Sequence, residues 1–207
     1  MPARRSTKTR RTPGADKRQR DADRSRERLL EAALDVISAK GFAGARVHEI
    51  AERAGVNAQL ISYYFGGKEG LYQALQQLWL EREATFNDPE VPLEELAGRY
   101  LHDALSEPRL ARLLLWAALD EQNAEGASPR TQVRQDEQED VRRRQRRGEL
   151  APDFDPGMIQ LIMMGAILAP IALPQITREL TGLDPADPEF ERRFAEQLKL
   201  LARRLAR

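Results

Sequence analysis

The 207-residue chain has no cysteine and only two histidines. The lack of cysteine excludes disulfides, zinc–thiolate sites, iron–sulfur clusters and cysteine nucleophiles. The longest uninterrupted apolar run, residues 161–173, is shorter than the roughly 20 residues that a membrane-spanning helix needs. No apolar stretch follows the basic N-terminus before Leu29, which argues against a secretory signal peptide. We therefore expect a protein that stays in the cytoplasm.

Few residues are available for catalysis. The two histidines, His48 and His102, lie far apart in the sequence, and the chain has neither a Gly-rich phosphate loop nor an HExxH zinc motif. Asp153 and Asp155 lie in a proline-rich segment and suit turn and helix-start positions better than a catalytic pair. We therefore expect a protein that is not an enzyme and needs no cofactor or metal.

Charge is abundant and unevenly distributed. The chain has 33 Lys plus Arg and 33 Asp plus Glu, but residues 1–70 hold 15 basic and 9 acidic residues, and residues 71–207 hold 18 and 24. A net +6 in the first part favours a nucleic acid or another anionic partner. Residues 1–23 contain almost no apolar side chain and predict a disordered basic arm, which either contacts nucleic acid or is a solvated tail.

Apolar residues recur at helical spacing along the rest of the chain, and no stretch alternates convincingly as a strand. Prolines precede several of these stretches, in the position that a helix tolerates best. The pattern predicts an all-α fold of about nine helices, at 24–41, 47–54, 57–65, 68–86, 93–105, 108–123, 129–147, 156–173 and 188–206.

Residues 47–66 have the pattern of a helix-turn-helix, in which two short helices are joined by a turn that contains Gly55. The first helix of this motif supports the second, which can then lie in the major groove of DNA. Four residues of the second helix are expected to face outward: Ala58, Gln59, Ser62 and Tyr63. Gln59 can pair with adenine, Ala58 can contact a thymine methyl, and the hydroxyls can reach bases or phosphates.

Three neighbouring residues are further candidates for DNA contact. Asn57 precedes the second helix and can cap it. Lys68 lies at the N-terminal end of the next helix, where a cation is unfavourable unless it shares an outside anion such as a DNA phosphate. Tyr64 can add a hydroxyl there. Alternatively, Lys68 extends into solvent and Tyr64 packs on the first helix.

The stretch RVHEIAERAGVNAQLISYYFGGKEGL, residues 46–71, closely resembles the DNA-binding domain of the TetR family of transcriptional regulators. The matching features are an Ile-Ala pair, an Ala-Gly-Val turn, an aromatic-rich helix ending in Phe and a following Lys-Glu-x-Leu. Arg46 stands where the family usually has a capping Thr, and Ser62 where a phosphate-contacting Tyr is frequent. Arg46 can instead reach a phosphate directly, and Tyr63 and Tyr64 can replace the missing Tyr. The expected DNA-binding residues are Arg46, Asn57, Ala58, Gln59, Ser62, Tyr63, Tyr64 and Lys68.

The resemblance implies an N-terminal DNA-binding domain of three helices at 24–84 and a C-terminal ligand-sensing and dimerisation domain at 85–207. In this family the last two long helices pair with those of a second subunit. The residues expected at that dimer interface are Leu161, Ile162, Ile167, Leu168, Phe190, Phe194, Leu198, Leu201 and Leu205. The alternative, burial within one subunit, leaves a single DNA half-site and weaker specificity.

The same resemblance implies a pocket for a small-molecule effector. The candidates for its lining combine adaptable apolar walls with a few polar groups: His102, Arg112, Trp116, Met163 and Met164. Such residues more often belong to the core. The five arginines at 142, 143, 144, 146 and 147 are expected on a solvated helix face.

These patterns together predict a sequence-specific DNA-binding regulator. We expect a homodimeric repressor that binds a palindromic operator and is released by a small apolar or amphipathic effector. The alternative is an architectural or cell-division DNA-binding protein of the same fold that has no effector. In either case we expect the protein to be associated with the nucleoid.

Overall fold

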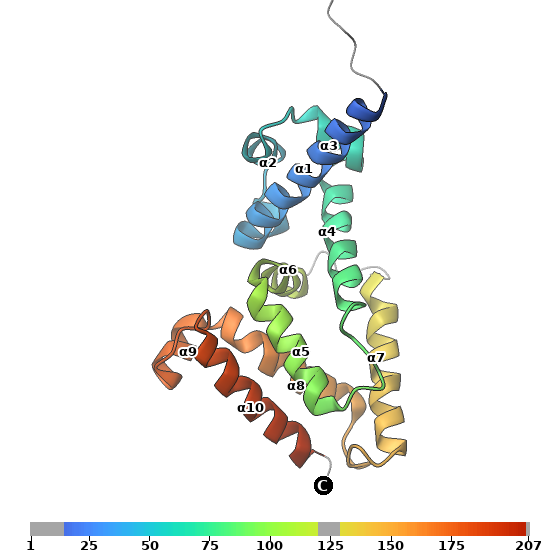
Figure 1. The fold of residues 1–207 in the computed structure, drawn as a ribbon, viewed down its shortest axis with the longest axis vertical. Coiled ribbons are helices and arrows are strands. Elements are labelled where there is room, and N and C mark those ends of the chain that lie inside the picture. Colours follow the sequence, from blue (N-terminus) through green and yellow to red (C-terminus); the bar gives the residue numbers. More distant parts are fainter. Residues whose placement is uncertain (1–14, 120–128, 206–207) are drawn as a thin grey trace, which may run out of the picture.

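The computed structural model describes residues 15–119 and 129–205, and every regular element in these ranges is a helix (Figure 1). The all-α prediction is confirmed, with ten helices in the described ranges in place of about nine. They are α1 (Ala15–Gly44), α2 (Val47–Ala54), α3 (Gln59–Phe65), α4 (Lys68–Glu83), α5 (Leu93–Ser106), α6 (Pro108–Leu119), α7 (Pro129–Arg146), α8 (Pro156–Ala172), α9 (Pro174–Thr181) and α10 (Pro188–Arg204).

The first helix is longer than predicted. It begins at Ala15, so the expectation of a disordered arm over 1–23 is wrong for residues 15–23, while residues 1–14 lie outside the described residues. Along this stretch Gln19 Nε2 donates to Asp23 Oδ1 at 3.0 Å. Side-chain pairs four residues apart, together with helix-forming Ala, Arg and Gln, extend the helix although few apolar residues are present.

The helix that the sequence pattern missed is α9. Pro174 occupies its first turn and Gly182 ends it with a left-handed φ of 71°. Ile176 and Leu180, four residues apart, are its helical signal, but the segment is short and lies directly after the apolar run of α8. The prolines at 108, 129, 156 and 188 begin helices as expected.

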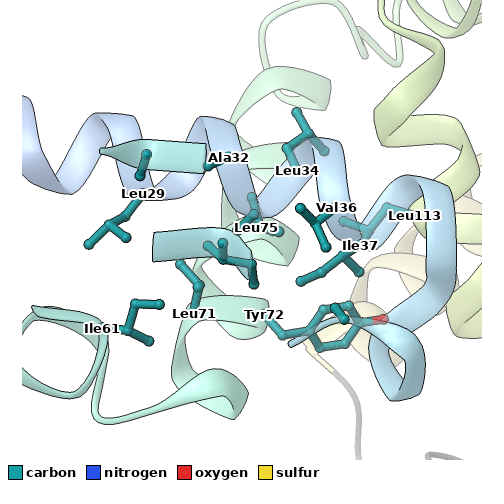
Figure 2. Close-up of a cluster of buried hydrophobic side chains, with 14 of the residues drawn as sticks. Leu29, Ala32, Leu34, Val36, Ile37, Ile61, Leu71, Tyr72, Leu75 and Leu113 are labelled. Carbon is teal, nitrogen blue, oxygen red and sulfur yellow. The ribbon is translucent and has the colours of Figure 1, made fainter. Parts of the chain in front are cut away.

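One apolar cluster joins α1 to α4. This cluster, which we call the N-terminal core, consists of the buried apolar residues of α1–α4 together with Leu110 and Leu113 of α6. Figure 2 shows Ile37, Ile61 and Leu75 converging in it, and each of these three side chains is fully buried. Because α6 packs against α1 and contributes Leu113 to this core, the helices that support the helix-turn-helix are joined directly to the rest of the molecule.

The later helices form two smaller clusters at the other end of the molecule. The α10 helix packs along α5, and α8 contacts α5, α6 and α7 (Figure 1). Leu101, Ile167 and Leu198 belong to one cluster, and Ile159 and Met163 belong to the other. Splitting the apolar core in this way leaves room for the cavity described below.

The most apolar helix is α8. In the part of the chain that the structure describes, no single helix is long and apolar enough to cross a bilayer, and α8 and α9 meet that length only as a pair bent by 92°.

Candidate nucleic-acid interface and ligand cavity

The turn of the helix-turn-helix is fixed by backbone geometry and by α1. Gly55 has φ 63° and ψ 39°, a left-handed conformation that favours glycine, and its N–H donates to Glu52 O at 3.0 Å. Arg28 Nη2 of α1 donates to Gly55 O at 3.3 Å and lies 2.6 Å from where a Cβ on Gly55 would stand. The left-handed conformation therefore favours glycine at this position, and a larger residue would also displace the Arg28 guanidinium.

The next helix, α3, presents a polar outer face. Asn57 Oδ1 accepts a hydrogen bond from Gln59 N–H at 2.8 Å, so the predicted cap is confirmed. Ile61 is fully buried in the N-terminal core, whereas Gln59, Ser62 and Tyr63 are exposed, with Tyr63 reaching 78%. We call these three residues the exposed α3 face.

Ala58, which was predicted for this face, and Tyr64, which was predicted to lie near Lys68 or to pack on the first helix, both point partly inward. Ala58 and Tyr64 are half-buried and pack against the N-terminal core. The Tyr64 ring makes edge contacts with both Tyr63 and Phe65, at centroid distances of 4.9 and 6.4 Å. Tyr64 therefore packs behind the exposed α3 face and supports Tyr63.

Lys68 and Arg46 occupy different environments. Lys68 Nζ lies 4.3 Å from the centroid of the Phe42 ring, so its charge is held by a cation–π contact rather than extending into solvent. Arg46 is exposed at the start of α2, and its side chain makes no capping hydrogen bond there. Arg46 therefore does not take over the capping role of the Thr that the family usually has at this position. Its guanidinium remains accessible for a phosphate.

A network of charges joins α6 to α1 and α2. Arg109 Nη1 of α6 donates to Asp35 Oδ1 of α1 at 2.6 Å, and Arg109 also pairs with Glu107 at 2.6 Å. Arg53 of α2 pairs with the other oxygen of Asp35 at 2.6 Å. Hydrogen bonding to Arg109 holds the pKa of Asp35 and of Glu107 below its usual range. The network therefore connects α6 to α2 through one α1 carboxylate.

Three of the residues predicted to line an effector pocket lie away from the large cavity of the molecule. Trp116 packs over Gly41, where a Cβ would stand 3.0 Å from the ring, and its Nε1 donates to Ser38 O at 3.1 Å. His102 is exposed and contacts Glu191 at 2.8 Å, and Arg112 is exposed on α6. None of these three residues lines the large cavity between α4, α5, α7 and α8, and His102 borders a separate hollow between α5 and α10.

That cavity has a volume of about 440 Å³ and is enclosed by α4, α5, α6, α7, α8 and the segment joining α4 to α5. We call it the ligand cavity. Met163 and Met164 line it, as predicted, beside Leu96, Ile167 and Leu168. Its size falls within the range of pockets for small organic molecules, and most of its wall is apolar.

One part of the ligand cavity is polar, and sequence reasoning missed it. Glu83 of α4 is only 3% exposed and accepts a hydrogen bond from the Tyr100 hydroxyl at 2.5 Å. Glu137 of α7 lies beside Glu83 and accepts a hydrogen bond from the Gln160 amide. We call Glu83 and Glu137 the carboxyl pair. Among the described residues, no group of three acidic or histidine side chains is arranged to hold a metal ion.

Burial controls the ionisation of this part of the wall. Removal from water raises the pKa of Glu137 above that of a free glutamate, although Arg134 opposes the shift. Burial and the nearby Glu83 also raise the pKa of the Tyr100 phenol. Glu83 continues the spacing of Leu71, Leu75 and Trp79 on α4, so an acidic residue on an apolar stripe was the signal in the sequence.

The arginine run of α7 is not a uniformly solvated face. Arg144 is 1% exposed and binds Asp140 at 2.8 Å, Glu149 at 3.1 Å and Pro89 O at 3.0 Å. Arg143 lines the ligand cavity. The expectation for these two residues is wrong because Arg144 lies one helical turn from the buried Val141 and finds enough acceptors to be buried.

The residues predicted for the dimer interface divide into two groups. Those on the outer surface of α8 and α10 are Leu161 (63% exposed), Ile162 (54%) and Leu201 (39%). Those buried inside the subunit are Ile167, Phe190 and Leu198, and Leu168, Phe194 and Leu205 are half-buried. The prediction is wrong for the buried three, because they are covered within their own subunit: Phe190 and Leu198 lie on α10, which packs along α5, and Ile167 lies on α8, which contacts α5, α6 and α7.

The comparisons with known proteins match both ends of the chain. The family model for bacterial regulatory proteins of the tetR family matches residues 29–75, and the model for the tetracyclin repressor-like C-terminal domain matches residues 92–204, more than half of the chain. The chain belongs to the TetR family. It is a helix-turn-helix transcriptional regulator, and the helix-turn-helix predicted from residues 47–66 is confirmed.

Individual TetR-family relatives agree. The transcriptional repressor SCO4008 of Streptomyces coelicolor is 30% identical over 90% of this chain and 97% of its own length. The repressor NicS of Pseudomonas putida is 37% identical over 39% of this chain, and that match spans only 42% of NicS. The solved structure of SCO4942 from Streptomyces coelicolor has a TM-score of 0.69 at 25% identity and covers 86% of this chain and 97% of its own.

Proposed function

We propose that this TetR-family regulator is a homodimeric repressor that binds a palindromic operator and leaves it when a small molecule occupies the ligand cavity. The exposed α3 face carries the proposal. Gln59, Ser62 and Tyr63 are accessible on a helix whose inner side is locked in place by Ile61 and whose start is capped by Asn57. A rigid helix with exposed donors and acceptors suits readout of base edges in the major groove.

Dimerisation is supported by the outer surface of α8 and α10. Leu161, Ile162 and Leu201 are exposed there, which is costly in water for a chain that acts alone. This surface lies at the opposite end of the molecule from α2 and α3 (Figure 1). Pairing two subunits through it would leave both exposed α3 faces free for two half-sites of an inverted repeat.

Release by an effector is supported by the position of α6. Leu114 of α6 lines the ligand cavity, Leu113 is buried in the N-terminal core, and Arg109 is bound to α1. A ligand that shifts α6 would therefore also shift the DNA-binding helices. The required difference in affinity between the two conformations is typically about 1–3 kcal/mol.

The remaining parts of the proposal follow from this arrangement. We infer a division near residue 84 into a DNA-binding domain and a ligand-sensing, dimerising domain, although α6 is packed on both. We also infer that the protein acts by binding rather than by catalysis, and that it is associated with the nucleoid. The relatives SCO4008 and NicS are both named repressors, which supports repression as the sign of regulation.

The test is selection of genomic DNA fragments by the purified protein at physiological salt. We expect a few enriched fragments that share an inverted repeat, and loss of that enrichment in a Gln59→Ala, Tyr63→Ala double variant, since both residues are exposed and neither supports the core. Arg112→Ala, an exposed change on α6, is the matched control and should retain enrichment. Dispersed enrichment without a shared repeat would instead support an architectural DNA-binding protein.

A further inference from the structure

The first part of α1 extends beyond the N-terminal core. The helix begins at Ala15, whereas its first buried residue among those described is Leu29. We call residues 15–28 the α1 extension, which is about 20 Å long at the rise of an α-helix. Figure 1 shows it at the same end of the molecule as α2 and α3, opposite to α8 and α10. Because none of its described side chains is buried, packing within the subunit does not account for this stretch.

Two arginines attach the α1 extension to the helix-turn-helix. Arg28 Nη2 donates to the carbonyl oxygen of Gly55 at 3.3 Å, in the turn before α3. Arg26 Cζ lies 5.3 Å from the centroid of the ring of Phe65, the last residue of α3, in a cation–π contact. These contacts fix the position of the α1 extension relative to the exposed α3 face.

Exposed arginines form a stripe along one side of the α1 extension. Arg20, Arg24 and Arg28 are four residues apart, so successive side chains are about 40° apart around the helix axis. Among the described residues, none of these three pairs with a carboxylate. Exposed arginines on other helices do pair with carboxylates: Arg53 with Asp35, Arg147 with Glu90 and Arg203 with Glu94.

Two of the three described carboxylates of the α1 extension lie on a neighbouring face. Asp23 and Glu27 are four residues apart, and Asp23 accepts a hydrogen bond from Gln19 at 3.0 Å. The third, Asp21, lies beside the arginines, three residues before Arg24. The arginine stripe therefore carries an excess of positive charge close to α3.

We propose that the α1 extension is a second DNA-binding element, in which Arg20 and Arg24 bind backbone phosphates beside the half-site that the exposed α3 face reads. The inference rests on the function proposed above, because it adds a contact to the same operator complex. The attachment to α3 favours DNA as the anionic partner: when α3 lies in the major groove, the α1 extension is brought close to neighbouring phosphates. The helix is already ordered, so binding costs less conformational entropy than it would for an unfolded tail.

The test is the salt dependence of DNA binding by the full-length protein. Fluorescence anisotropy measures the affinity for a selected operator fragment and for an unrelated duplex of the same length, from about 50 to about 300 mM KCl. Each lost phosphate contact makes the slope of log affinity against log salt shallower by about 0.9, and a dimer of the Arg20→Gln, Arg24→Gln double variant loses about four contacts. We expect a slope shallower by about 3–4 and an affinity at least about tenfold weaker at about 100 mM KCl. Unchanged affinity and slope overturn the proposal.

Two control variants separate charge at this position from other effects. Arg112→Gln, Arg142→Gln removes two exposed charges from α6 and α7, outside the helix-turn-helix, and should leave affinity and slope unchanged. Arg20→Lys, Arg24→Lys keeps both charges and should retain most of the slope, with an affinity within about threefold of that of the parent protein. An equal loss in the first control would assign the effect to net charge, and an equal loss in the lysine variant would assign it to the helix itself. Either result contradicts the proposal.

A variant that gains affinity provides a readout that misfolding would not give. Asp21→Asn removes the carboxylate beside the arginines and should tighten DNA binding by at least about twofold at about 50 mM KCl, since its repulsion of the phosphates is lost. Glu139→Gln removes an exposed carboxylate from α7 and is the matched control, which should have no effect. Binding by Asp21→Asn that is no tighter than binding by Glu139→Gln contradicts the placement of the stripe against phosphates.

Failure of this inference and failure of the proposed function give different results. Because phosphate contacts carry no sequence information, Arg20→Gln, Arg24→Gln should lose affinity for both duplexes and keep the ratio of the two affinities within about twofold. If an operator is selected but the double variant binds it as the parent protein does, the function stands and the α1 extension is a solvated helix. If no operator is selected but the unrelated duplex shows the expected change in slope, the phosphate contact stands and the sequence-specific function is wrong.

Discussion

The N-terminal core and the ligand cavity are both lined by packed helices, yet one is filled and the other is hollow. In the N-terminal core Ile37, Ile61 and Leu75 are fully buried and their neighbours are apolar. The wall of the ligand cavity, in contrast, contains two carboxyl side chains, the buried Glu83 and the half-buried Glu137. A DNA-reading helix needs one fixed position, which dense packing provides. A ligand-sensing domain instead needs an empty space with polar groups on its wall that can bind the ligand.

The largest expected contrast comes from equivalent truncations in the two regions. Leu71→Ala removes a fully buried side chain from the N-terminal core and should lower the free energy of unfolding by about 2–5 kcal/mol, through lost burial and a new void. Met163→Ala, on the wall of an existing cavity, should cost about half as much or less, since part of its surface already lacks neighbours. Urea unfolding measures the free energy of unfolding of both variants. All samples need the same protein concentration, because dimerisation contributes to stability.

Equal costs for the two truncations would contradict the contrast. They would mean that the ligand cavity is filled in solution by side chains that rearrange. Ile37→Val, a smaller change in the N-terminal core, is the internal reference and should cost about 0.5–1.5 kcal/mol.

A second contrast concerns added rather than removed volume. A Cβ on Gly70 of α4 would stand 1.8 Å from the backbone oxygen of Phe65, the last residue of α3. Because a backbone atom cannot move aside as a flexible side chain can, Gly70→Ala should displace α3, lower stability by about 1–3 kcal/mol and weaken operator binding. Band-shift titration of a selected operator fragment measures the second effect.

The control is another helical glycine at the opposite end of the molecule. A Cβ on Gly98 of α5 meets only Lys199 Cε, at 3.8 Å, which is an ordinary contact. Gly98→Ala should therefore be neutral or stabilising by about 0.5–1 kcal/mol, since alanine loses less backbone entropy on helix formation. Operator affinity that survives in Gly70→Ala would show that α3 is not held by this contact.

The same contrast explains what the sequence could predict. The helix-turn-helix depends on signals within a few residues of one another, such as Gly55 in the turn, Asn57 at the cap and Ile61 on the inner face, so its position could be predicted closely. The carboxyl pair depends on helices far apart in the chain, and no local pattern places Glu83 beside Glu137. Its environment appears only when α4, α5, α7 and α8 are packed together.

The errors have the same origin. Helical spacing shows which residues share a face but not which of two apolar faces is covered by its own subunit. On α10, Leu198 is buried against the subunit while Leu201, three residues later, is exposed. Arg144 was expected in solvent from its charge, although its neighbours Asp140 and Glu149 allow burial.

The smallest expected effect is a pair of opposite pH dependences. Arg109 lowers the pKa of Asp35 in the folded protein, so Asp35 stabilises the fold above its unfolded pKa of about 3.9 and loses this contribution as pH falls through the folded value. Asp35→Asn should therefore destabilise at pH 7, by about 1 kcal/mol, with a difference that disappears at low pH.

Glu137 should behave in the opposite way. Burial raises its pKa in the folded protein, so its favourable contribution is complete below the unfolded pKa of about 4.3 and is lost as pH rises through the folded value. Glu137→Gln should then stabilise the ligand-free protein at pH 7 and have no effect near pH 4. Urea unfolding between pH 4 and pH 8 measures both variants, with Glu52→Gln, an exposed change on α2, as the baseline. Destabilisation by Glu137→Gln at pH 7 would mean that the ionised carboxylate of Glu137 stabilises the fold, and would contradict the expected sign of its pH dependence.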